Sequence, residues 1–194
     1  MKVKLTFVEP ILGTWPADPE VAKTYIASNA PDATTITDEI AATSVEEVVE
    51  KSMTIFPRTE TGPFLYDHQI KGFFKDACGI LARVKGTESS KIKAYKKVID
   101  GLIFPEPRKI PIEVNGEIRS CQRPLRAQTA QGERVSLANS EEIPAGSSVT
   151  FSVRLLDPGH EKLVFEWLDY GKLRGIGQWR NSGKGRFEYE LVEE

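Results

Sequence analysis

Residues 170–189 read YGKLRGIGQWRNSGKGRFEY, a stretch in which five glycines and five basic residues surround one tryptophan, Trp179. No acidic residue occurs between positions 171 and 187. Glycine lets a backbone approach a partner closely and leaves its amides accessible, while lysine and arginine donate charge-assisted hydrogen bonds to phosphate. The stretch therefore favours a phosphate-bearing partner, with nucleic acid as the first choice.

The glycine spacing excludes two common nucleotide motifs. A P-loop places four residues between its first glycine and a Gly-Lys pair that Ser or Thr follows. Here five residues separate Gly177 from Gly183-Lys184, and Gly185 comes next. A dinucleotide fingerprint needs a third glycine where Arg180 stands. A flexible connection with solvated cations stays open as the alternative, and Trp179 suits either a stacked base or a cover for the core.

The hydrophobic pattern around this stretch predicts an α+β fold. Residues 2–8 (KVKLTFV) alternate like a half-buried strand, and apolar residues at spacings of three and four predict a helix over residues 67–84. Residues 148–156 and 186–192 predict two further strands, and Asp157-Pro158 begins a second long helix. Strand, helix, strands, helix, strand is the order of a ferredoxin-like or RRM-like βαββαβ domain.

Three shorter elements complete the prediction. A helix with outward lysines is expected over residues 91–99. A hairpin is expected over residues 110–120, where IPIEV and EIRS flank an Asn-Gly turn. Residues 134–138 (RVSLA) form another candidate strand.

Charge is distributed unevenly along the chain. Residues 17–60 hold nine acidic and three basic residues, whereas residues 71–134 hold fourteen basic and seven acidic ones. Start signals at Asp18 and Ser44 predict two short helices in the acidic segment. We therefore expect a single domain over residues 1–194, in which residues 10–60 form an acidic, partly irregular insertion after strand one rather than core. Because the net charge is −2, local basic patches would have to attract a polyanion.

The remaining composition argues against several classes of protein. Cys78 and Cys121 are the only cysteines, and no apolar stretch follows the first residues, so neither a disulfide framework nor secretion is indicated. No apolar run approaches the ~20 residues of a membrane helix. His68 and His160 are far from each other and from the cysteines, so neither a metal site nor a cofactor is expected. The expected compartment is the cytoplasm.

Three segments carry a family resemblance. GPFLYDHQIKGFFKDA (residues 62–77) leads a loop into a helix through Ile70, Lys71 and Gly72, with Lys75 shortly after. SLANSEEIPAGSSVTFSVRLL (residues 136–156) combines an acidic turn, a Pro-Ala-Gly bend and a strand. GIGQWRNSGKGRFEY (residues 175–189) is a glycine-rich loop before the last strand. In this order the segments, about a third of the chain, resemble the RAMP superfamily (repeat-associated mysterious proteins), especially the backbone subunits of CRISPR effector complexes.

The resemblance implies an RRM-like sheet that grips an RNA backbone, with the glycine-rich loop and the start of the first helix near the phosphates. It also implies partners, either CRISPR effector subunits or copies of the same chain. A solitary or phage-borne relative is the alternative to membership of an effector complex. The positions carried over are Lys71, Gly72 and Lys75 at the helix and Gly175, Gly177, Gly183 and Gly185 in the loop.

A second basic cluster surrounds Cys121 in RSCQRPLR, residues 119–126, and could form one groove with the loop. The predicted nucleic-acid-binding set is Lys71, Gly72, Lys75, Arg119, Arg123, Arg126, Lys172, Arg174, Gly175, Gly177, Trp179, Arg180, Gly183, Lys184, Gly185 and Arg186.

Two functions follow. The first is a single-stranded RNA-binding, RAMP-like protein without its own catalytic activity. The alternative is a phage factor that mimics a CRISPR subunit and modulates the effector by protein contact, with the acidic segment imitating nucleic-acid charge. Some relatives cut RNA with an aspartate after strand one or a histidine near the first helix, which makes Asp18, Asp32 and His68 candidates. Aspartates favour caps and turns, and a structural role is also the favoured interpretation of His68, whose imidazole is the alternative candidate as a base for a ribose hydroxyl. It has no identified acid–base partner.

Overall fold

The main sheet is built on β1 (Lys2–Phe7), whose alternate residues Val3, Leu5 and Phe7 are fully buried. The computed structural model describes residues 1–17, 53–129 and 132–193. In it, β1 lies between β11 (Ser148–Leu155) and β12 (Phe187–Val192), antiparallel to both. β7 (Ile103–Glu106) pairs with the other side of β11. With one long helix before β7 and another before β12, the chain order is βαββαβ, and the ferredoxin-like, RRM-like α+β prediction is confirmed.

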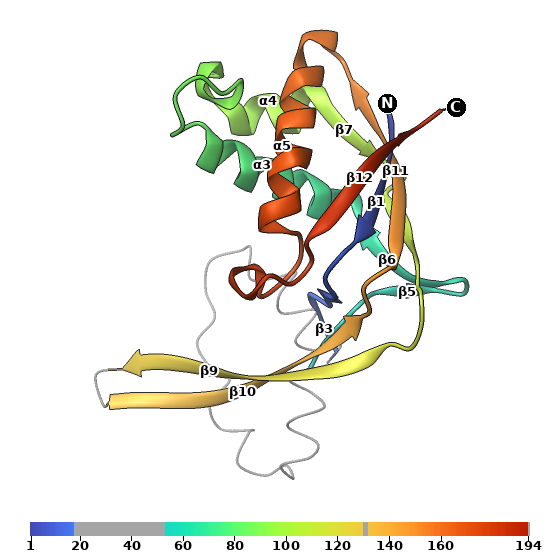
Figure 1. Ribbon diagram of the computed structural model, residues 1–194, viewed down its shortest axis with the longest axis vertical. Helices are drawn as coiled ribbons and strands as arrows, with labels where there is room; N and C mark the ends of the chain where they lie inside the picture. Colours follow the sequence, from blue (N-terminus) through green and yellow to red (C-terminus); the bar gives the residue numbers. More distant parts are fainter. Residues whose placement is uncertain (18–52, 130–131, 194) are drawn as a thin grey trace, which may run out of the picture.

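The two long helices, α3 (Asp67–Leu81) and α5 (Glu161–Arg174), cover one face of this sheet (Figure 1). Phe74 of α3 packs on Trp167 of α5, with ring centroids 5.3 Å apart. Burying each such side chain stabilises the fold by roughly 1.5–3 kcal/mol. Both helices lie where the apolar spacing predicts them, because that spacing creates the stripe that must be buried.

The predicted hairpin over residues 110–120 is wrong. β8 (Lys109–Glu113) pairs with β11 and with β6 (Gly62–Tyr66), which in turn pairs with β5 (Arg58–Thr59). An Asn-Gly pair reflects only a local preference for a tight turn between paired strands. Here the burial of alternate β8 residues in the main sheet outweighs that preference. After the turn the chain enters another sheet instead of returning along β8.

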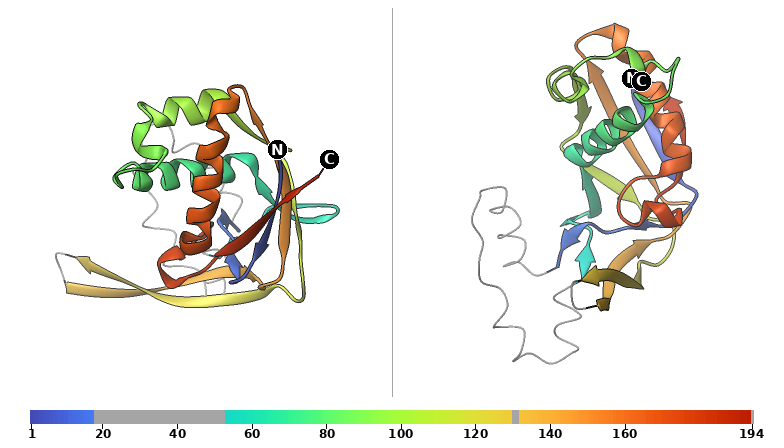
Figure 2. Two further views of the ribbon diagram at one scale, coloured as in Figure 1. Left: turned by 45° about the horizontal axis from the view of Figure 1, so that its top comes forward. Right: turned by 90° about the vertical axis from the view of Figure 1, so that its left-hand side faces the viewer.

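A long two-stranded arm leaves the body between the second and third strands of the βαββαβ frame. It consists of β9 (Arg119–Thr129) and β10 (Gly132–Ile143), which pair along their whole length and extend beyond the helices (Figures 1 and 2). The candidate strand at residues 134–138 is part of β10 and is confirmed. At its base, β10 also pairs with two short strands, β2 (Ile11–Leu12) and β4 (Thr54–Ile55). β4 in turn pairs with β3 (Trp15–Pro16).

The ends of the predicted insertion belong to the core, which corrects the expectation for residues 10–60 at these positions. Ile11, Leu12 and Phe56 are at most 1% exposed. Their burial depends on contacts with distant strands, which a local reading of polarity cannot detect. The helices expected at Asp18 and Ser44 lie outside the described residues.

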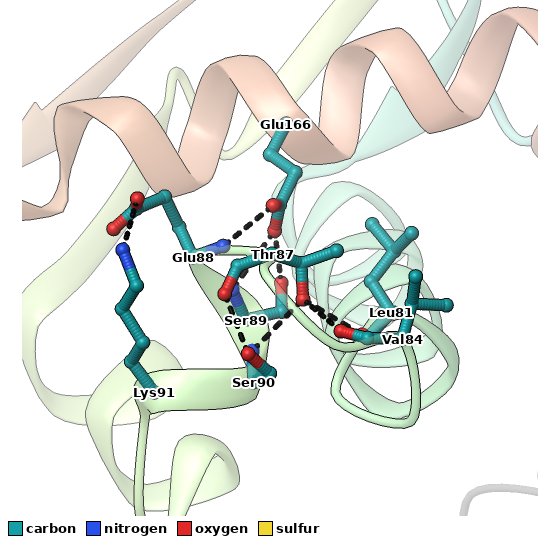
Figure 3. A network of polar contacts seen from close by, with 8 residues as sticks. All are labelled: Leu81, Val84, Thr87, Glu88, Ser89, Ser90, Lys91 and Glu166. Carbon is teal, nitrogen blue, oxygen red and sulfur yellow. Dashed lines mark hydrogen bonds and ion pairs between the residues drawn. The ribbon is translucent and has the colours of Figure 1, made fainter.

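The predicted helix over residues 91–99 begins later, as α4 (Tyr95–Leu102), because the preceding residues are held in another conformation. Ser89–Lys91 form a short 3₁₀ turn that docks on α5 (Figure 3). The Glu166 carboxylate accepts hydrogen bonds from the backbone N–H groups of Glu88 (2.7 Å) and Ser89 (2.9 Å) and from the Ser89 hydroxyl. Trp167 Nε1 donates to the same hydroxyl at 2.9 Å. We call this set the Glu166 network.

None of the helices in the described part of the chain is long and apolar enough to cross a membrane. Cys78 and Cys121 are both free thiols.

Candidate nucleic-acid interface

The glycine-rich loop, residues 175–186, is closed by its own backbone. Ile176 N–H donates to the Gly185 carbonyl (3.0 Å), and Gly185 N–H donates to the carbonyl of Pro10 (2.8 Å), just after β1. Gly185 has a φ of +73°, and a Cβ there would lie 1.9 Å from the Ile176 carbonyl oxygen. Glycine is therefore required at this position by the loop's own closure, whether or not a ligand approaches.

Two cations of the loop fasten it to the rest of the molecule. Arg180 Nη1 lies 2.6 Å from Asp76 Oδ2 on α3. Lys184 Nζ lies 2.5 Å from Glu142 Oε2 at the base of β10. The loop is thus fixed between the first helix and the arm, so these side chains do more than project into solvent.

The remaining predicted cations near the loop also make internal contacts. Arg174 Nε lies 3.6 Å from Asp76 Oδ2, and Arg186 Nε donates to the Lys172 carbonyl (3.1 Å). Lys172 Nζ lies 3.3 Å from Asp169 and 3.4 Å from Glu188. These groups contribute to the fold of the loop before any ligand is considered.

The second basic cluster meets the loop through Arg123. This side chain is 5% exposed; its guanidinium donates to Ser140 Oγ (2.9 Å) and to Gln178 Oε1 (2.7 Å). It also lies 5.4 Å from the ring centroid of Trp179, which is 39% exposed. Arg119 is exposed at the base of β9, and Arg126 lies further out on β9, where only the backbone is described.

Lys71 and Lys75 point toward α4. Lys75 Nζ lies 2.6 Å from Asp100 Oδ1, and Lys71 Nζ donates to the Asp100 carbonyl at 3.1 Å. Lys71 Nζ also lies 4.3 Å from the centroid of the Phe104 ring. The structure therefore separates these two lysines from the glycine-rich loop.

A cavity of about 310 Å³ lies where three segments meet: the residues after β1, the first turns of α3 and the glycine-rich loop. We call it the junction cavity. It is lined by Ile11, Leu12, Thr14, Trp15, Pro57, Leu65, Tyr66, His68, Gln69, Gly72, Phe73, Ile176, Gly177 and Arg180. Three members of the predicted set, Gly72, Gly177 and Arg180, are brought together here. A Cβ on Gly72 would meet no atom within 4 Å, so no neighbouring backbone explains this glycine.

Aromatic rings form one wall of the junction cavity. Tyr66 has its ring centroid 5.7 Å from that of Trp15 and 5.0 Å from that of His68, whose plane is inclined by 24°. Gln69 holds this wall in place, since its amide donates to Thr14 Oγ1 (2.7 Å) and accepts from Tyr66 N–H (2.7 Å). The same cavity is thus lined by aromatic rings and by the guanidinium of Arg180, a combination that suits a nucleobase with its phosphate.

Sequence reasoning missed Trp15 and Tyr66. Trp15 stands in a segment that we expected to be an irregular insertion, and Tyr66 is the last residue of β6. The available signal was an aromatic residue, Tyr66, immediately before the predicted helix start at Asp67. The central strands β1 and β11, by contrast, carry Lys4, Thr6 and Thr150 between their buried residues, so they offer no aromatic platform there.

His68 lines the junction cavity and is 64% exposed at its side chain. Its Nδ1 lies 3.8 Å from Asp67 Oδ1. The described residues contain no cluster of three or more His, Cys, Asp or Glu side chains that could hold a metal. Asp18 and Asp32 lie outside the described residues. A catalytic role of His68 therefore stays a hypothesis.

Comparison with solved structures identifies a chain with the same fold in the cryo-EM structure of the Type III-B Cmr-beta bound to cognate target RNA. The TM-score is 0.50 at 11% sequence identity, with 99% of this chain and 59% of that chain covered. The present chain thus spans about three fifths of that chain. A chain of a Type IV-B CRISPR complex matches with a TM-score of 0.46 at 11% identity, covering 98% of this chain and 89% of the other. No family model and no curated protein matches.

Proposed function

We propose that this chain is a RAMP-like, single-stranded RNA-binding protein that holds RNA at the junction cavity and has no catalytic activity of its own. One observation carries the proposal: the cavity unites the glycine-rich loop, the start of α3 and the segment after β1, and its lining includes Trp15, Tyr66 and Arg180. We also propose one domain over residues 1–194, with an acidic insertion within residues 10–60.

Stacking on the aromatic wall supplies the first part of the expected affinity. A base stacked on an aromatic ring contributes roughly 1–3 kcal/mol and requires little sequence discrimination. Arg180 supplies the second part. Its guanidinium has five N–H donors, and the contact with Asp76 uses Nη1, so further donors are available for a phosphate oxygen.

The expected affinity is modest because much of the predicted basic surface is engaged within the protein. Lys184 and Arg123 already have internal partners, and the net charge is −2. Modest affinity per chain is sufficient for an RNA that several copies of this chain or neighbouring subunits bind at the same time. The shared fold with a chain of an RNA-bound effector supports a CRISPR-related role, with effector subunits or copies of this chain as partners and the cytoplasm as location.

A second function, the phage-borne mimic that binds an effector through protein contact, is favoured by one specific observation. The loop cations Arg180 and Lys184 are paired with acids on α3 and β10, so they keep the shape of an RNA-binding loop with less free charge. Such a loop could occupy the place of a subunit without carrying RNA.

The test is the binding of labelled single-stranded RNA of about 12 nucleotides, measured by fluorescence anisotropy between ~50 and ~200 mM salt. We expect binding that weakens steeply with salt, and a loss of roughly fivefold or more in affinity for Trp15→Leu. Phe104→Leu, which lines no described cavity, is the matched aromatic control and should bind like wild type.

Absence of binding to any oligonucleotide at low salt would refute RNA binding. The mimic would then be tested by adding the purified chain to a reconstituted CRISPR effector and measuring complex formation. In the same RNA samples we expect the labelled strand to stay intact. Cleavage that disappears in His68→Ala would instead establish an enzyme.

A further inference from the structure

A second hollow of about 340 Å³ adjoins the junction cavity. It is lined by Trp15, Ile55, Phe56, Pro57, Arg58, Phe64, Tyr66 and Lys109. We call it the edge cavity, because Arg58 belongs to β5, the edge strand of the main sheet, and Phe64 belongs to the neighbouring strand β6. Trp15, Pro57 and Tyr66 line both cavities. The two hollows are therefore separated by a wall made of these side chains.

The edge cavity combines aromatic walls with cations. The rings of Phe64 and Tyr66 meet edge to face, with centroids 4.9 Å apart and planes inclined by 81°. Lys109 Nζ lies 5.4 Å from the centroid of Phe64, and its side chain is exposed on β8. An anionic ligand with a flat apolar part matches this combination better than an apolar peptide, which would leave the ammonium group unused.

Contacts from the base of the arm fix the remaining wall. The Glu141 carboxylate on β10 accepts from the backbone N–H of Phe56 (2.9 Å) and from Arg58 Nη2 (2.7 Å). Arg58 Nη1 also reaches the Phe56 carbonyl at 3.3 Å. The guanidinium is thus oriented in advance, so a ligand does not have to order it.

We propose that the edge cavity is a second nucleotide subsite, which takes the nucleotide next to the one in the junction cavity on the same RNA strand. This inference rests on the proposed function. The aromatic wall between the two cavities offers a ring to each occupant, since Trp15 and Tyr66 line both. Lys109 contacts the phosphate of the nucleotide in the edge cavity, and the base contacts the half-buried rings of Trp15 and Tyr66 rather than Phe64, which is 3% exposed.

The test compares Lys109→Gln with Lys97→Gln, a matched exposed lysine on α4 that lines neither cavity. Anisotropy is measured with single-stranded RNA of about 12 nucleotides over a salt series. Lys109→Gln is expected to weaken binding roughly fivefold and to lower the slope of log K against log salt by about one. Lys97→Gln is expected to leave both quantities unchanged.

A second measurement counts the nucleotides held. In competition against the same labelled RNA, a dinucleotide should bind wild type roughly fivefold or more tightly than a mononucleotide, and Lys109→Gln should remove this advantage. Equal affinity for both competitors, or a dinucleotide advantage that survives Lys109→Gln, overturns the second subsite. Binding that Trp15→Leu abolishes while Lys109→Gln leaves it intact overturns the subsite and keeps the proposed function. Absence of all binding refutes the proposed function itself.

Discussion

The contacts of Asp76 with arginines at the glycine-rich loop and the Glu166 network are each centred on one carboxylate, yet they differ in their surroundings. Glu166 collects donors from a turn that lies against α5 (Figure 3). The side chain of Trp167, the next residue on α5, is fully buried. Asp76 collects Arg174 and Arg180, whose side chains are 25–29% exposed, and Arg180 also lines the junction cavity. Ion pairs and hydrogen bonds alone therefore do not distinguish a purely structural contact from a binding site. The presence of an adjoining cavity makes the distinction.

The largest effect on stability is expected from a pair of glycine substitutions, of which one should destabilise the fold and the other should stabilise it. Gly185→Ala should lower the free energy of unfolding by about 2–4 kcal/mol, because its Cβ would collide with the Ile176 carbonyl at a positive φ. Gly72→Ala should raise it by roughly 0.5–1 kcal/mol, because nothing occupies the space and alanine favours a helix. Urea unfolding followed by circular dichroism measures both. Equal stability of the two variants would show that the loop is not closed as described.

Ser89→Ala should separate stability from binding. Its hydroxyl serves both Trp167 Nε1 and Glu166, so its removal should lower the free energy of unfolding by about 1–3 kcal/mol. RNA affinity should stay at the wild-type value, because no residue of this network lines either cavity. The neighbouring Ser90→Ala, which loses an exposed contact with Thr87, is the control and should cost less. A loss of RNA affinity in Ser89→Ala would contradict the distinction between the two regions.

Arg180 and Arg174 both pair with Asp76, so substituting each of them in turn tests which one contacts the ligand. Arg180→Gln should lower RNA affinity roughly tenfold or less and reduce the salt slope by about one, because Arg180 lines the junction cavity. Arg174→Gln loses the same partner, Asp76, but lines no described cavity, so its affinity should change little. Both variants should unfold within about 1 kcal/mol of wild type, as expected for partly exposed ion pairs. Anisotropy and urea unfolding on the same samples check both statements.

The smallest effect concerns the thiol of Cys78, which lies beside the Glu166 network. Burial raises the pKa of this thiol; the nearby Glu166 charge raises it further, while a hydrogen bond with Ser89 acts in the opposite direction. An unfolded thiol loses its proton at about pH 8.5, so the folded state retains a proton that the unfolded state releases, and stability falls as pH rises past that value.

The loss attributable to Cys78 should be at most about 1.4 kcal/mol per pH unit. Urea midpoints of wild type and Cys78→Ala at about pH 7 and about pH 9.5 measure it, with wild type declining more. Cys121 and Tyr189, whose pKa values burial also raises, are present in both proteins and cancel in the comparison. Parallel declines would show that Cys78 does not contribute.

Residues 110–120 and Trp15 show where prediction from the sequence ends. The Asn-Gly pair correctly marks a turn region, but the partner of β8 depends on which distant strands bury its alternate residues. Trp15 lies in a segment whose local composition resembles a loop, and it becomes part of a wall only because β6 brings Tyr66 beside it. Arg123 was predicted as a nucleic-acid-binding residue of a basic cluster, yet it is buried because the arm folds against the loop.

By itself, the sequence determined the order of strands and helices in the βαββαβ frame, since apolar periodicity and glycine positions are local properties that need no partner. It also determined that residues 175–186 form a loop before the last strand. Only the tertiary structure decided which cations face acids and which border a cavity, because both depend on residues far apart in the chain. Arg180 shows the difference: its charge is evident in the sequence, but its position between Asp76 and the junction cavity exists only in the fold.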